Sequence, residues 1–68
     1  MTEIKLRTQY IKLGQLLKAA GLADTGSGAK DEVLSGGVTV NGDTELRRGR
    51  KIYPGDIVRF GNEEIRAV

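Results

Sequence analysis

A run of basic residues, Arg47-Arg48-Gly49-Arg50-Lys51, carries the clearest chemistry in this sequence. Three of its four cations are arginines, whose planar guanidinium groups bind phosphate oxygens in pairs and stack on nucleic-acid bases. Gly49 lets the chain bend, so these side chains need not alternate between two faces. Tyr53 adds a ring that stacks on a base or packs beside Pro54. The run favours a phosphate-binding surface, although charge in a loop also serves simple solvation.

The segment GLADTGSGAK, residues 21–30, is rich in glycine and precedes an expected helix, as phosphate-binding loops do. A Walker loop requires lysine where Ser27 stands, and the dinucleotide-binding fingerprint requires glycine where Asp31 stands. Nucleotide hydrolysis is therefore not supported. A weaker hypothesis is that the hydroxyls of Thr25 and Ser27, the loop N–H groups and Lys30 hold one backbone phosphate. The alternative is that a polar residue of this loop only caps the helix.

The residue types that most catalytic and metal sites need are missing. The chain has no cysteine and no histidine, which removes disulfides, thiolate ligands and the usual general base. Its paired carboxylates, Asp31-Glu32 and Glu63-Glu64, are sequence neighbours, and such neighbours point in different directions on a helix or strand. We therefore expect a solvated role for them. The sequence predicts no enzyme activity, no cofactor, no metal and no small-molecule substrate.

The charge is unevenly distributed along the chain. The 68 residues predict one domain, residues 1–68, near the lower size limit for folding without disulfides or metals. Residues 1–46 carry five basic and six acidic groups, and residues 47–68 carry six basic and three acidic groups, a net +3. Most of that excess lies in the basic run, which focuses positive potential there. The lack of a long apolar stretch and of a signal-peptide core predicts a cytoplasmic protein without membrane contact.

Hydrophobic spacing indicates the first elements that position these residues. The alternation of Ile4 and Leu6 predicts a strand over residues 3–7. The next apolar side chains recur at the spacing of an amphipathic helix: Leu13, Leu16, Leu17 and Ala20. They predict a helix over about residues 12–20, followed by Gly21 in the left-handed conformation of a C-terminal cap.

A second, shorter helix is expected over residues 28–35, directly after the glycine-rich segment. Ala29, Val33 and Leu34 have the spacing of an inward face. Gly36-Gly37 would end this helix and let the chain turn sharply into the next strand.

Strand and turn signals alternate in the rest of the sequence. Val38 and Val40 precede Asn41-Gly42, the preferred dipeptide of a two-residue hairpin. Pro54-Gly55 fits the centre of a type II turn, and Gly61-Asn62 separates two further strands. The sequence therefore predicts an α+β fold, a helix–loop–helix packed on a small, mostly antiparallel sheet of four to five short strands.

The order of these motifs resembles the RNA-binding domain first seen in the small-subunit ribosomal protein S-four. The similar segment is KLGQLLKAAGLADTGSGAKDEVLSGGVTVNG, residues 12–42, followed by PGDIV, residues 54–58. The resemblance covers about residues 11–60 and is greatest to the stand-alone form, the short bacterial YaaA-like and YbcJ-like proteins. The matching positions are Leu16, Gly21, Leu22, Ala29, Val33, Gly36, Val38, Val40, Asn41, Gly42, Gly55 and Asp56.

The resemblance implies the S-four-like fold, or alpha-L motif, and the binding of structured RNA, ribosomal or transfer, in ribosome biogenesis or translation. Phosphates and exposed bases would be contacted from the helix–loop–helix face and the hairpin loop. Gly26 replaces an arginine that is usual in the family, and Asp31 stands where a basic residue is common. The basic run therefore takes on greater weight. The candidate RNA contacts are Lys12, Thr25, Ser27, Lys30, Asn41, Arg47, Arg48, Arg50 and Lys51.

Three other interpretations fit parts of the sequence. A β-grasp sulfur carrier shares the VNG and GDIV motifs but acts through a C-terminal Gly-Gly, whereas this chain ends Arg66-Ala67-Val68. A protein-docking module would place its basic loop on an acidic partner. An accessory subunit would deliver RNA to a separate enzyme, and the sequence leaves both of these alternatives open.

Overall fold

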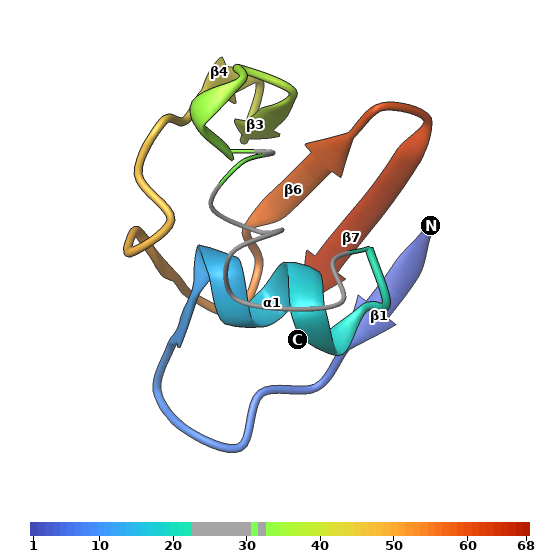
Figure 1. Cartoon of the computed structure of the whole chain (residues 1–68). Coiled ribbons are helices and arrows are strands. Elements are labelled where there is room, and N and C mark those ends of the chain that lie inside the picture. The colour runs from blue at the N-terminus through green and yellow to red at the C-terminus, as the bar shows by residue number, and fades with distance from the viewer. Residues whose placement is uncertain (23–30, 32) are drawn as a thin grey trace.

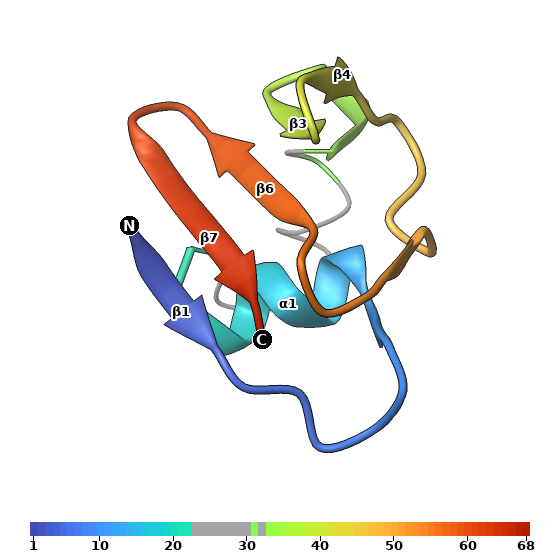
Figure 2. The same cartoon turned by 180° about the vertical axis from the view of Figure 1, so that it is seen from behind.

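In a computed structural model, which describes residues 1–22, 31 and 33–68, one helix packs against a five-stranded sheet. The elements in chain order are β1 (Thr2–Ile4), β2 (Ile11–Lys12), α1 (Leu13–Ala19), β3 (Val38–Val40), β4 (Asp43–Thr44), β5 (Lys51–Ile52), β6 (Ile57–Phe60) and β7 (Glu63–Ala67). Figure 1 and the reverse view in Figure 2 show α1 lying across one face of β6 and β7. The predicted α+β class is confirmed.

The main sheet has the strand order β1-β7-β6-β3-β4. Three neighbouring pairs, β7–β6, β6–β3 and β3–β4, are antiparallel, so the predicted antiparallel character holds for most of the sheet. The expected first strand, however, pairs in parallel with the last one, with Thr2 opposite Ile65 and Ile4 opposite Ala67. This pairing joins the two ends of the chain, and no local sequence signal specifies such a distant partner.

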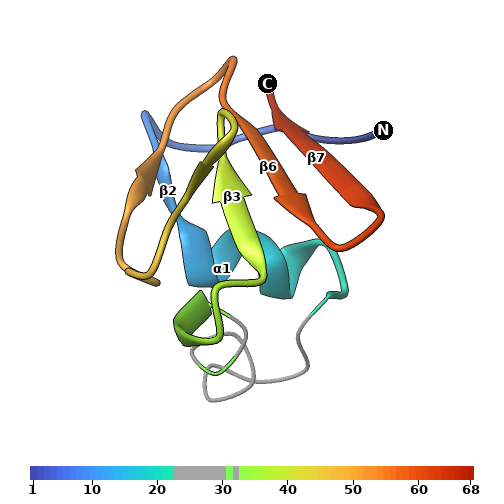
Figure 3. The ribbon, with the colours of Figure 1, turned by 90° about the horizontal axis from the view of Figure 1, so that it is seen from above.

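A second, two-stranded sheet is formed by β2 and β5, and it was not anticipated as a separate element. Ile11 lies opposite Ile52 and Lys12 opposite Lys51. Lys12 was expected in the first turn of the helix, but its backbone is extended (φ −74°, ψ 145°), so α1 begins one residue later. Figure 3 shows β2 on the side of the molecule away from β7.

The predicted apolar face of the first helix forms the centre of the core. Leu13, Leu16 and Leu17 are fully buried. They pack with Val33 and with the buried side chains of the sheets: Val38, Val40, Ile52, Val58, Ile65 and Ala67. Burying each of these larger aliphatic side chains contributes about 1.5–3 kcal/mol before entropy is subtracted.

Gly21 ends α1 as expected, with φ +76°. Its N–H donates to the carbonyl of Lys18 at 3.1 Å, and the N–H of Leu22 donates to that of Leu17 at 2.9 Å. These two bonds form a Schellman motif, which satisfies carbonyls at the helix end.

Of the second predicted helix, the described residues Asp31, Val33 and Leu34 are helical, while Ala29 lies outside the described residues. Val33 is buried as predicted, but Leu34 is 57% exposed. Because successive helical residues are about 100° apart, Val33 occupies the inward position and its neighbour faces water. The expected inward position of Leu34 was therefore wrong.

The turn predictions are confirmed. Asn41 (φ +52°) and Gly42 (φ +90°) join β3 to β4 as a two-residue hairpin with two left-handed residues, the type I′ arrangement. Gly55 has φ +99°, and the N–H of Asp56 donates to the carbonyl of Tyr53 at 3.0 Å, which closes the type II turn. Within the described part of the chain, no helix has the length and apolar character to cross a membrane.

Candidate nucleic-acid interface

The basic run lies between β4 and β5 and is anchored by its backbone. Arg47, Arg48 and Arg50 belong to the connecting loop as predicted, whereas Lys51 is the first residue of β5. The N–H of Leu13 donates to the carbonyl of Arg50 at 2.8 Å, and the N–H of Gly14 donates to that of Arg48 at 2.9 Å. The loop thus supplies acceptors for the first N–H groups of α1, which has no side-chain cap.

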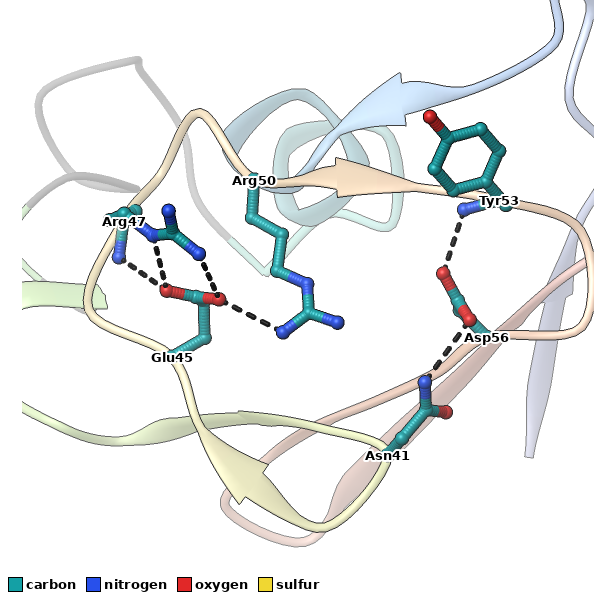
Figure 4. A network of polar contacts seen from close by, with 6 residues as sticks. All are labelled: Asn41, Glu45, Arg47, Arg50, Tyr53 and Asp56. Atoms are coloured by element: carbon teal, nitrogen blue, oxygen red, sulfur yellow. Dashed lines mark hydrogen bonds and ion pairs between the residues drawn. The ribbon is translucent and has the colours of Figure 1, made fainter.

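A buried carboxylate organises the arginines of this loop. Glu45 Oε2 accepts from the backbone N–H of Arg47 at 3.1 Å and from Arg47 Nε at 3.2 Å. Glu45 Oε1 accepts from Arg50 Nη1 at 3.0 Å and from Arg47 Nη2 at 3.5 Å. Figure 4 shows both guanidinium groups converging on the one carboxylate. We call Glu45, Arg47 and Arg50 the Glu45 network.

The Glu45 network holds cations at the surface rather than inside the protein. The side chain of Glu45 is only 8% exposed, whereas those of Arg47 and Arg50 are 79% and 34% exposed. Hydrogen bonds from Arg47 and then Arg50 outweigh burial and lower the pKa of Glu45 to about 2, so its carboxylate is ionised at neutral pH. The same contact raises the pKa of Arg47. Each guanidinium has five N–H donors, so both keep donors for another anion.

An open hollow at this loop is lined by Arg47, Gly49, Arg50 and Lys51. Gly49 was expected to let the chain bend. Its φ lies outside the left-handed region, and a Cβ there would meet no atom within 4 Å. The bend therefore does not depend on glycine. What fixes the loop instead is its pairing with α1 and the Glu45 network.

The β2–β5 pair brings a further predicted contact beside the loop. Lys12 lies directly across from Lys51, although the two residues are far apart in the sequence. Beyond them, the rings of Tyr10 and Tyr53 lie with centroids 5.8 Å apart. Lys51 Nζ lies 4.9 Å from the centroid of the Tyr10 ring, within cation–π distance. We call this outward surface, made of Tyr10, Lys12, Lys51 and Tyr53, the ribbon face.

Asn41 lies in a second polar network. Its Nδ2 donates to Asp56 Oδ1 at 3.1 Å, and its Oδ1 accepts from the N–H of Ile57 at 2.9 Å. Asp56 Oδ2 also accepts from the N–H of Tyr53 at 2.8 Å. These four residues form the Asp56 network, which ties the β3–β4 turn to the type II turn, and Figure 4 shows Asn41 apart from the guanidinium groups. A contact between Asn41 and RNA stays a prediction.

Three other candidates, Thr25, Ser27 and Lys30, lie outside the described residues.

One important residue was missed by the sequence analysis. Glu45 is the only polar or charged residue that is buried in the described part of the chain. The available signal was its position two residues before Arg47 and five before Arg50, but this spacing alone does not indicate burial.

The fold and this surface define a class of protein: a small α+β domain with one core helix and a solvent-facing basic loop that a buried carboxylate holds in place. Residues 4–68 match the S4 domain family, and the chain belongs to that family. The match is longer than the segment on which the sequence resemblance rested, because it extends from Ile4, the last residue of β1, to the end of β7.

Relatives of similar length share most of this chain. A Bacillus subtilis protein named as a probable ribosome maturation protein, RlbA, is 40% identical over 65 residues, which cover 91% of this chain and 92% of that protein. YbcJ of Escherichia coli is 34% identical over 59 residues, covering 87% and 84% of the two chains. The solution structure of YbcJ, described as revealing an alpha-L motif involved in RNA binding, superposes with a TM-score of 0.76 at 32% identity, covering 100% of this chain and 87% of YbcJ.

Proposed function

We propose that this protein binds structured RNA through the basic loop, residues 47–51, as part of ribosome assembly or translation. The observation that carries the proposal is the Glu45 network, in which a buried carboxylate holds two arginines with donors facing water. Membership of the S4 domain family supports the same function.

The proposed mechanism is electrostatic and geometric. Arg47 and Arg50 are held in place before RNA arrives, so less side-chain entropy is lost on binding, about 0.5–1.5 kcal/mol for each side chain. Their remaining N–H groups match the paired oxygens of a phosphate. Arg48, Lys51 and Lys12 add charge around them. Such contacts recognise the backbone and shape of RNA, with little reading of base sequence.

The RNA that we propose as ligand is ribosomal or transfer RNA, in the cytoplasm. Support for ribosomal RNA comes from the name of the Bacillus subtilis relative, which refers to ribosome maturation. A role for Thr25, Ser27, Lys30 and Asn41 as additional contacts remains part of the proposal. Nothing in it requires a cofactor or a catalytic group.

The test is the affinity for an RNA hairpin measured over a series of salt concentrations. Replacing Arg47, Arg48, Arg50 and Lys51 with Ala should flatten the plot of log affinity against log salt by about 0.7–0.9 for each phosphate that the variant no longer binds. Arg59→Ala combined with Arg66→Ala, on exposed positions of β6 and β7, is the charge-removal control and should change the slope much less.

The four-alanine variant leaves Glu45 buried without its arginines, which is destabilising. A second variant therefore adds Glu45→Gln, and NMR spectra establish that both variants are folded. An unchanged salt slope in a folded variant would place the RNA site elsewhere. Wild-type protein that binds an acidic protein partner but no RNA would favour the docking module instead.

A further inference from the structure

The ribbon face carries two kinds of side chain in an ordered arrangement. Strand residues alternate between faces, and in β2 and β5 the paired Ile11 and Ile52 turn inward, with Ile52 fully buried. Lys12 and Lys51 therefore share the outward face, and the next residues on that face are Tyr10 and Tyr53. The contact between Lys51 and the Tyr10 ring is consistent with this alternation.

The two tyrosines are not equivalent. Tyr10 is the more buried of the two, whereas Tyr53 is exposed, with 48% of its surface accessible. Their rings are tilted by 48°, so that Tyr10 braces one side of Tyr53. The backbone of Tyr53 is also fixed, because its N–H donates to Asp56. Tyr53 thus presents an aromatic surface to water from a rigid position.

Neither the pair of facing lysines nor the exposed tyrosine ring of the ribbon face is favourable for the free protein. Like charges directly across a pair of strands are destabilising, and an exposed ring forgoes the free energy of burial. A ligand that combines negative charge with a flat aromatic surface would offset both costs. A nucleotide has this combination in one molecule, with a phosphate for the lysines and a base for the ring.

We propose that Tyr53 stacks on an unpaired base of the bound RNA, while Lys12 and Lys51 contact the neighbouring phosphates. The inference rests on the proposed RNA binding and narrows the ligand to structured RNA with an unpaired nucleotide beside a paired stem. In Figure 4, Arg50 and Tyr53 lie at opposite ends of β5. Three residues of extended chain span about 10 Å, so the base lies about that far from the phosphates held by the basic loop.

The experiment compares two RNA hairpins with the same stem, one blunt and one with a single unpaired 2-aminopurine beside the stem. The emission of 2-aminopurine falls when it stacks on a ring, and the affinity of both hairpins is measured in parallel. Three variants are used: Tyr53→Ala, Tyr53→Phe and Leu46→Ala. Leu46 is 53% exposed and close to the same loop but has no ring, so it controls for the removal of apolar surface.

We expect wild-type protein to quench the 2-aminopurine and to bind its hairpin roughly 5- to 100-fold more tightly than the blunt one. Tyr53→Ala should abolish both effects, so that the variant binds the two hairpins with equal affinity. Tyr53→Phe and Leu46→Ala should behave like wild type.

Equal affinity for the two hairpins, or quenching that survives Tyr53→Ala, would overturn the stacking site. If the blunt hairpin still binds with a salt dependence that requires the basic loop, the proposed function stands without it. Absence of binding to either hairpin would overturn both the stacking site and the proposed function.

Discussion

The Glu45 network and the Asp56 network are built on the same principle but differ in what they leave exposed. In each, one carboxylate accepts hydrogen bonds from two other residues. Around Asp56 the donors include the backbone of Tyr53, and Asn41 binds the backbone of Ile57 in turn. Around Glu45 the donors are mainly guanidinium groups, one of them 79% exposed.

The difference separates a structural role from a binding role. The hydrogen bonds of the Asp56 network brace the type II turn and tie it to the β3–β4 turn. The Glu45 network orients cations that still have donors for a ligand. Asn41 and Asp56 lie on the family pattern, whereas Glu45 does not. Matching a family motif therefore identified turn-forming residues, and the residue that positions the proposed site emerged from the structure.

The largest effect on stability is expected when the Asp56 network is removed. Asp56→Ala eliminates two hydrogen bonds to a charged acceptor and should lower the free energy of unfolding by about 2–3 kcal/mol. Urea unfolding at neutral pH measures this change. The affinity for the blunt RNA hairpin, which offers no unpaired base to Tyr53, should stay close to that of wild type where the variant is folded.

Asp43→Ala is the matched control for this variant. Asp43 is an exposed acidic residue of β4, and its replacement removes the same charge with a change in stability within about 0.5 kcal/mol. If Asp56→Ala weakened binding of the blunt hairpin much more than Asp43→Ala did, the Asp56 network would have a direct part in phosphate binding and the comparison would fail.

A smaller loss of stability is expected for Glu45→Gln, about 1–2 kcal/mol at neutral pH, because the amide retains one acceptor. The contribution of Glu45 depends on pH. Its pKa falls from 4.5 to about 2 on folding, so its stabilisation is complete above about pH 4.5 and is lost as the pH falls towards about 2. The free energies of unfolding of wild type and variant, measured in urea, should therefore converge over this pH range. A difference that stays constant down to pH 2 would contradict the assigned role.

The affinity of Glu45→Gln for an RNA hairpin tests whether the Glu45 network has a binding role. At an ionic strength of about 0.15 M the Debye length is about 8 Å, which limits the gain from removing one negative charge. Loss of the fixed arginine orientation should then weaken binding by about 2- to 10-fold. Glu63→Gln, at an exposed position of β7, controls for the charge. Tighter binding by Glu45→Gln would show that Glu45 only competes with RNA for the arginines.

The correct sequence predictions rest on local interactions. Asn41-Gly42, Pro54-Gly55 and Gly21 were placed correctly because each supplies a backbone conformation that few other residues adopt. The buried face of α1 followed from the spacing of its leucines. The family resemblance then supplied the order of the elements, which local signals do not determine.

The errors and omissions concern partners that are distant in the sequence. The parallel pairing of β1 with β7 and the two-residue strand β2 depend on segments more than 35 residues away. The burial of Glu45 depends on how its loop packs beside α1. Leu34 was assigned inward from a short helical pattern in which one position, that of Val33, was enough to cover the core.

The most direct test of whether the Glu45 network binds RNA and the Asp56 network does not is an NMR titration of wild-type protein with the blunt RNA hairpin, following the backbone amides and the arginine Nε–H groups. We predict that the largest chemical-shift changes occur at residues 47–51, including the Nε–H groups of Arg47 and Arg50, and that Asp56 and Ile57 change little. Large changes at Asp56 and Ile57, with the loop signals unmoved, would contradict the account.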